Sequence, residues 1–131
     1  MSPDELTKKV EEIKAAGNER FLKGDYTQAK ALYTDALSLN PNIVAIYSNR
    51  AICELKLEQY GLAIADATKA IELDATFAKA YYRRACAHLA ILDPKAALPD
   101  LKVVVQLAAR NAHVKLHLVA PSTLVRCLPV E

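Results

Sequence analysis

Residues 10–43 read VEEIKAAGNERFLKGDYTQAKALYTDALSLNPNI, and two further stretches of the same length and pattern follow without a gap. Residues 44–77 read VAIYSNRAICELKLEQYGLAIADATKAIELDATF, and residues 78–111 read AKAYYRRACAHLAILDPKAALPDLKVVVQLAARN. Self-similarity at a fixed period of this size is the signature of a repeat architecture. The chain is therefore predicted to contain three tandem repeats, with these three ranges as their bounds.

Small side chains recur at fixed positions of the repeat. The three series, each spaced by one repeat length, are Gly17, Ala51 and Ala85; Ala29, Ala63 and Ala97; and Ala36, Ala70 and Val104. A large apolar series, formed by Ile13, Tyr47 and Tyr81, lies between them. Small side chains at fixed helical positions allow two helices to approach closely, so each repeat is predicted to be an antiparallel helix pair.

Each repeat divides into two helical stretches. The stretches are predicted at Glu11–Lys23 and Tyr26–Leu39, Ala45–Leu57 and Leu62–Leu73, and Lys79–Ile91 and Lys95–Leu107. Gly24 supplies a helix stop, Asp25 and Asp93 are good N-caps, and Pro94 suits a first helical position. The interior Pro99 is expected to bend the last helix near its start. The fold class is all-α, with residues 1–9 as a lead-in and residues 112–131 as an atypical tail.

Composition excludes several classes of protein. The chain has 131 residues, 53% hydrophobic, with a net charge of only +2. It has no basic footprint for nucleic acid or an anionic membrane, and no uninterrupted apolar run long enough to span a bilayer. The polar N-terminus is unlike a signal peptide, and the odd number of cysteines (Cys53, Cys86 and Cys127) favours free thiols. A cytoplasmic or nuclear protein is expected.

The helix–turn–helix period of about 34 residues, with its small-residue pattern, resembles the tetratricopeptide repeat over residues 10–111. The resemblance implies stacked helix pairs that curve into a right-handed superhelix. In that family the first helix of each pair lines a concave groove that suits an extended peptide. An unrelated helical bundle is the alternative, and three gapless copies of the repeat argue against it.

Five polar residues on the first helices are candidates for this groove. Lys14 and Asn18 are four residues apart and share a helix face, as do Lys79 and Arg83, while Asn49 lies on the helix between them. The set offers hydrogen-bond donors and no carboxylate. Such donors hold carboxylates by charge-assisted hydrogen bonds, and arginine can do so bidentately.

The same five residues match the dicarboxylate clamp of chaperone-binding tetratricopeptide domains. The resemblance implies that the partner is the extreme C-terminus of a heat-shock chaperone, which ends in Glu-Glu-Val-Asp, the ninety-kDa type first and the seventy-kDa type second. It also implies that Lys14, Asn18 and Asn49 hold the main-chain carboxylate. Lys79 and Arg83 would then hold the other acidic group.

A secondary set of inward residues consists of Phe21, Ile52, Leu55 and Cys86. These residues form either a pocket for an apolar peptide side chain or ordinary core. Lys56 is a candidate for one further contact with an acidic peptide residue.

Residues 58–74 and 79–85 are similar to the N-terminal domain of the protein phosphatase 5 family. In that family the repeats bind a chaperone and also cover the active site of a following phosphatase domain, which makes a phosphatase catalytic domain a second expected partner. The chain lacks the motifs of a two-metal phosphatase. It is expected to be a targeting or autoinhibitory module and not an enzyme, with no cofactor.

Three other functions are alternatives. A generic repeat scaffold that binds a different peptide is the main one. A metal site at His113, His117 and Cys127 lacks a fourth ligand with suitable spacing. RNA binding would need a basic face with stacking aromatic residues, which the interspersed acidic residues argue against. The apolar residues of the tail, interrupted by Pro121 and Pro129, suggest self-association.

Overall fold

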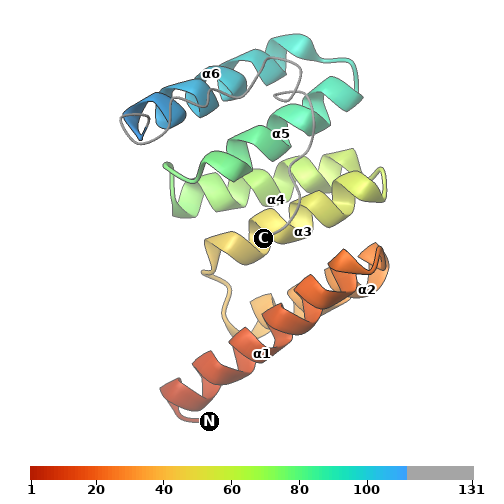
Figure 1. Cartoon of the computed structure of the whole chain (residues 1–131), viewed down its shortest axis with the longest axis vertical. Coiled ribbons are helices and arrows are strands. Elements are labelled where there is room, and N and C mark those ends of the chain that lie inside the picture. The colour runs from red at the N-terminus through yellow and green to blue at the C-terminus, as the bar shows by residue number, and fades with distance from the viewer. Residues whose placement is uncertain (112–131) are drawn as a thin grey trace.

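The computed structural model describes residues 1–111, and within them it contains six α-helices and no strand. The helices are α1 (Pro3–Leu22), α2 (Tyr26–Leu39), α3 (Val44–Lys56), α4 (Tyr60–Leu73), α5 (Ala78–Ala90) and α6 (Pro94–Arg110). They follow one another along the length of the molecule in chain order (Figure 1). The all-α prediction is confirmed.

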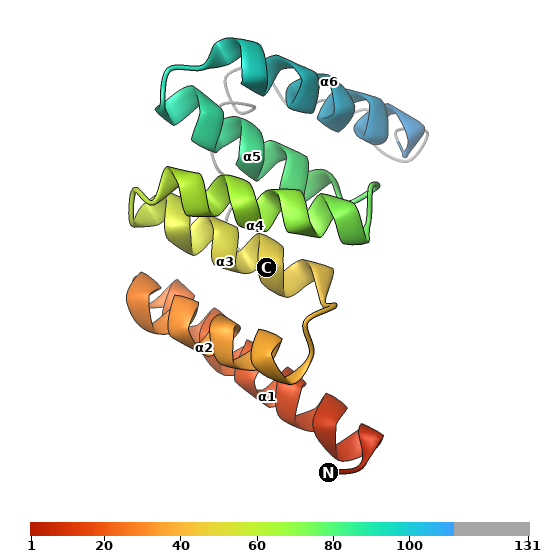
Figure 2. The same ribbon diagram turned by 180° about the vertical axis from the view of Figure 1, so that it is seen from behind.

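The helices are arranged in two layers of a stacked array. Each repeat contributes one antiparallel pair, α1 with α2, α3 with α4 and α5 with α6, and each pair packs on the next through α2 with α3 and α4 with α5. The first helices, α1, α3 and α5, lie along one face of the array (Figure 1), whereas α2 and α4 face the viewer from the opposite side (Figure 2). The first helices therefore share one surface, as the repeat pattern predicts.

The small-residue positions lie where helices touch. The alanines of the three series, from Ala29 to Ala97, are fully buried. At Gly17 a Cβ would lie 2.7 Å from Cε1 of Tyr33, whose side chain is also fully buried. A Cβ is essentially never found so close to another atom, so α1 and α2 approach each other at a distance that only glycine permits at this point.

Two helix boundaries differ by more than two residues from the sequence-based prediction. Helix α1 begins at Pro3 and not at Glu11, because Ser2 and Glu5 form a capping box with bonds of 3.2 and 3.4 Å. Helix α6 extends to Arg110 and runs on through Pro99. At this position the proline removes only one intrahelical hydrogen bond, so the remaining bonds carry the helix forward.

The turn inside each repeat has the same backbone conformation. Gly24, Glu58 and Leu92, which occupy the same position of successive repeats, have φ angles of 81°, 60° and 61°. Asp25 and Asp93 then cap the following helices by accepting 3.2 Å hydrogen bonds from the amides of Gln28 and Ala96, as predicted. The second turn ends earlier than predicted, so that Gly61 lies inside α4.

None of the helices in residues 1–111 has the length and apolar character needed to cross a membrane.

Candidate functional site

Asn18 and Asn49 meet across the surface shared by the first helices. Asn18, on α1, accepts two hydrogen bonds at Oδ1, one from the hydroxyl of Tyr33 and one of 3.3 Å from Nδ2 of Asn49 on α3. An amide oxygen has two lone pairs, so these two donors fill it. Asn18 can then offer a ligand only the hydrogens of its amide group. Donors of this kind are what a carboxylate needs.

Lysines lie near both ends of this surface. Lys14 is one helical turn before Asn18 on α1 and is partly exposed. Lys79 lies in the first turn of α5 and is also partly exposed. Both ammonium groups belong to helices of the same layer. They add positive charge to the donors of the asparagine pair.

Arg83 is placed differently from the lysines. Its side chain is 1% exposed, and its Nη1 donates a hydrogen bond to Oγ of Ser48 on α3. Ser48 directly precedes Asn49, so the guanidinium reaches the helix that carries the asparagine. Side-chain hydrogen bonds thus link α1 to α3 through the asparagine pair and α3 to α5 through Arg83.

Four members of the secondary set lie in the hydrophobic core. Phe21 and Ile52 belong to the cluster between the first and second repeats, and Leu55 and Cys86 belong to the cluster between the second and third. Phe21 also packs edge-to-face on Tyr26 with ring centroids 5.2 Å apart. These positions agree with the core alternative. Lys56, the candidate for a further contact with an acidic peptide residue, is exposed.

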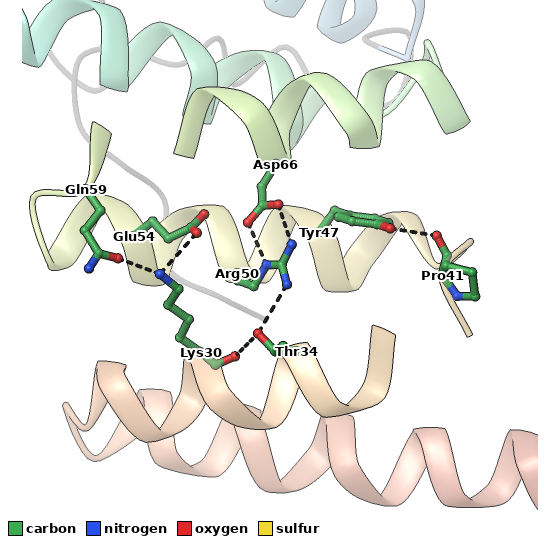
Figure 3. A network of polar contacts seen from close by, with 8 residues as sticks. All are labelled: Lys30, Thr34, Pro41, Tyr47, Arg50, Glu54, Gln59 and Asp66. Atoms are coloured by element: carbon green, nitrogen blue, oxygen red, sulfur yellow. Dashed lines mark hydrogen bonds and ion pairs between the residues drawn. The ribbon is translucent and has the colours of Figure 1, made fainter. Parts of the chain in front are cut away.

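A charged network on α3 escaped the sequence-based prediction. Arg50 binds Asp66 with two hydrogen bonds of 2.7 Å and donates a third, of 3.2 Å, to Thr34 (Figure 3). Its guanidinium lies 5.7 Å from the ring centroid of Tyr47. The hydrogen bonds from Arg50 to Asp66 raise the pKa of the arginine. The sequence signal was present, since the threonine, the arginine and the aspartate each recur one repeat later.

Glu54 is the second unpredicted ionisable group on α3. It is 3% exposed, and its carboxylate lies 3.5 Å from the ammonium of Lys30 on α2, which also donates a 2.7 Å hydrogen bond to Gln59 (Figure 3). Burial, and after it the neighbouring carboxyl group of Asp66, raise the pKa of Glu54 to about 8. Lys30 and Arg50 oppose this shift without cancelling it.

This shift predicts that the stability of the array falls as the pH rises. Glu54 holds its proton up to about pH 8 in the folded chain, whereas its ordinary pKa is 4.5. Between these two values the folded chain binds more protons than the unfolded chain, so the free energy of unfolding decreases with rising pH. Urea unfolding of the wild type and of Glu54→Gln, followed by circular dichroism from about pH 5 to about pH 9, measures the effect. We expect the variant to lose less stability across this range. An identical pH dependence of the two proteins would contradict the assignment to Glu54.

Comparison with known sequences identifies the repeats. A family model described as "Tetratricopeptide repeat" matches residues 15–43 and 44–77. The sequence is 44% identical over 119 residues to serine/threonine-protein phosphatase T of Aspergillus oryzae, covering 91% of this chain and 25% of the relative. It is 40% identical over 113 residues to human serine/threonine-protein phosphatase 5, covering 86% of this chain and 23% of the relative. The chain thus spans about a quarter of the length of these relatives.

Solved structures with the same fold include peptide complexes. The TPR2B domain of yeast Sti1, described as a complex with pHsp70, has a TM-score of 0.78 and 36% identity, covering 82% of this chain and 86% of that domain. The first TPR of Spaghetti (RPAP3), bound to the HSP90 peptide SRMEEVD, has a TM-score of 0.76 and 30% identity, covering 79% of this chain and 82% of that domain. Both likenesses extend over most of the described residues.

Proposed function

Because the chain belongs to the tetratricopeptide-repeat family, we propose that the surface shared by its first helices binds the C-terminal Glu-Glu-Val-Asp peptide of heat-shock chaperones. The observation that carries the proposal is the pairing of Asn18 with Asn49. The side-chain oxygen of Asn18 is already occupied, so this residue has only donors left for a ligand. The similar domains of Sti1 and RPAP3, described as complexes with chaperone peptides, support the choice of partner.

The five clamp residues have distinct parts in this proposal. Lys14, Asn18 and Asn49, on α1 and α3, bind the main-chain carboxylate of the last peptide residue. Lys79 and Arg83, on α5, bind an acidic side chain and neighbouring carbonyl groups. Lys79 and Arg83 lie on the same helix, and the hydrogen bond from Arg83 to Ser48 brings the guanidinium next to α3. Lys14 on α1, and Lys79 and Arg83 on α5, then supply charge-assisted bonds from the two helices that flank Asn49 on α3.

The larger protein in which such a domain acts is proposed from the relatives. The two phosphatases match 91% and 86% of this chain, which is 25% and 23% of their own length. We infer that the chain is a targeting or autoinhibitory domain of a protein phosphatase 5-like protein, with a phosphatase catalytic domain as its second partner. The ninety-kDa chaperone is the first choice of partner and the seventy-kDa chaperone the second. A cytoplasmic or nuclear location follows from these partners.

Binding of a labelled peptide that ends in Met-Glu-Glu-Val-Asp tests the proposal. Charge-assisted hydrogen bonds contribute about 1.5–3 kcal/mol each, and ordering the peptide offsets part of the sum, so we expect a Kd on the order of micromolar. Fluorescence anisotropy measures the Kd. A peptide with an amidated C-terminus is the matched control, since amidation removes only the main-chain carboxylate.

The two peptides separate the clamp from a generic repeat scaffold. Binding that weakens at least tenfold on amidation, about 1.4 kcal/mol, supports the clamp. Equal binding of both peptides, or binding of neither, would refute it and would leave a scaffold for a different partner. Binding is also expected to weaken with added salt, because the lysines of the groove are partly exposed to solvent.

A further inference from the structure

The same polar arrangement occurs at both boundaries between repeats. We name Thr34, Arg50 and Asp66 the first joint, and Thr68, Arg84 and Asp100 the second joint. In the second joint Arg84 binds Asp100 with hydrogen bonds of 2.8 and 2.7 Å and donates a 3.2 Å bond to Thr68. The corresponding bonds of the first joint are 2.7, 2.7 and 3.2 Å long. The second joint is thus a structural copy of the first.

Each joint ties three helices of two repeats together. Arg50 lies on α3, its carboxylate partner lies on α4 of the same repeat, and its threonine partner lies on α2 of the preceding repeat. Figure 3 shows the guanidinium of Arg50 between these two partners. Because the guanidinium is planar and rigid, three bonds to it fix the orientation of both partners. A joint therefore restrains the angle between one repeat and the next.

The sequence indicates that the joints act at the boundaries between repeats and not inside a repeat. The first repeat follows no other repeat within residues 1–111, and it carries Ala16 and Leu32 where later repeats have the arginine and the aspartate. Helix α6 carries Lys102 where α2 and α4 have the threonine. Polar residues of the joint type are thus present where two described repeats meet and are replaced elsewhere. An interaction needed only within a helix pair would occur in all three repeats.

The arginine of each joint lies next to a clamp residue in the sequence. Asn49 directly precedes Arg50, and Arg83 directly precedes Arg84. The guanidinium of Arg84 also lies 5.8 Å from the ring centroid of Tyr81, which is on the same helix as Lys79. The hydroxyl of Tyr81 donates a 2.8 Å hydrogen bond to the carbonyl of Ala75 in the loop before α5. Rotation of the joint arginine's helix would therefore move the clamp residues on it.

We propose that the two joints set the angles between successive repeats and so position the clamp residues of α1, α3 and α5 at the spacing of the two carboxylates. Arg50 and Arg84 are positioning residues that do not touch the peptide. The link to the peptide rests on the proposed function, whereas the control of the angle does not. A change in one joint alters one boundary only, because each joint spans one pair of neighbouring repeats.

The control of the angle is tested without any peptide. Threonine and valine have nearly the same shape, so Thr34→Val and Thr68→Val each remove the hydrogen bond to the joint arginine with little change in volume. Thr34→Val also removes the 2.9 Å bond that the hydroxyl of Thr34 donates to the carbonyl of Lys30 within α2. Residual dipolar couplings, measured by nuclear magnetic resonance, give the orientation of each helix pair. We expect Thr68→Val to change the angle between the second and third repeats alone, and Thr34→Val to change that between the first and second alone. Unchanged angles in both folded variants would overturn the proposal.

Peptide binding then tests the consequence for the clamp. Loss of one hydrogen bond of about 0.5–1.5 kcal/mol predicts that Thr68→Val weakens binding about twofold to tenfold. If the joint acts by positioning Lys79, the effect of Thr68→Val becomes smaller in a Lys79→Ala background, whereas the effect of Thr34→Val stays the same. Altered angles with additive losses in both backgrounds would refute the positioning of Lys79. Failure of the wild type to bind the peptide would refute the proposed function and leave the angle measurement to decide on the joints.

Discussion

Replacing Lys14 and Lys79 together by alanine is expected to weaken binding of the Glu-Glu-Val-Asp peptide about a hundredfold or more. Each lysine contributes a hydrogen bond from a charged donor, about 1.5–3 kcal/mol, and the two lie on different helices, α1 and α5. Their losses should add, because α3 separates these two helices in the array. Fluorescence anisotropy with the labelled peptide measures the change.

The matched control removes the same charge elsewhere. Lys8 and Lys102 are exposed, Lys8 on a different face of α1 from Lys14 and Lys102 on α6 in the opposite layer. The double variant Lys8→Ala, Lys102→Ala changes the net charge by the same amount as the clamp variant. It should bind with nearly the wild-type Kd. Equal weakening in the two double variants would mean that net charge, and not a clamp, attracts the peptide.

Replacing Gly17 by valine is expected to destabilise the array by about 3 kcal/mol. A Cβ alone would lie 2.7 Å from the buried ring of Tyr33, and valine adds two methyl groups to it. The ring is fully buried, and its withdrawal would break the hydrogen bond from its hydroxyl to Asn18. Urea unfolding, followed by circular dichroism, gives the change in free energy of unfolding.

Gly61→Val is the control for helix propensity. Gly61 also lies within a helix, α4, but no atom lies within 4 Å of the Cβ that a substitution would add. Valine has a slightly better helix propensity than glycine, so the free energy of unfolding should change by less than about 0.5 kcal/mol. If both variants lost the same stability, the close approach of α1 and α2 would not be the cause. The Gly17 variant should also bind peptide more weakly, because Asn18 is the next residue.

The repeat period made most of this fold predictable. The constant spacing located the turns, and glycine, aspartate and proline gave the end of α1 and the starts of α2 and α6 to within a residue. The start of α1 was missed because Ser2 and Glu5 lie outside the repeated frame, where only their capping-box spacing could reveal them. Helix starts that lie outside the repeats therefore have to be predicted from local capping motifs and not from the repeat period.

The candidate site was predictable in part. Helical spacing brought Lys14 and Asn18 to one face, and the repeat placed Asn49 on the next helix, where it meets Asn18. The burial of Arg83 against Ser48 was not predictable, because it depends on how closely α5 packs on α3. The joints were missed for a similar reason, since each threonine and arginine belong to different repeats. Predictions that fell on residues 112–131, including His113, His117 and Cys127, lie outside the described residues.

The turn within each repeat shows how little of its geometry is encoded by the turn residue itself. Glycine, glutamate and leucine adopt the same left-handed conformation at Gly24, Glu58 and Leu92, although for the last two it costs about 1 kcal/mol or more. The packed helices on either side supply that free energy. A residue other than glycine is therefore tolerated at this position as long as the helices keep their contacts. In this chain the buried alanines at positions 29, 63 and 97 mark the repeats more consistently than the residue at the turn does.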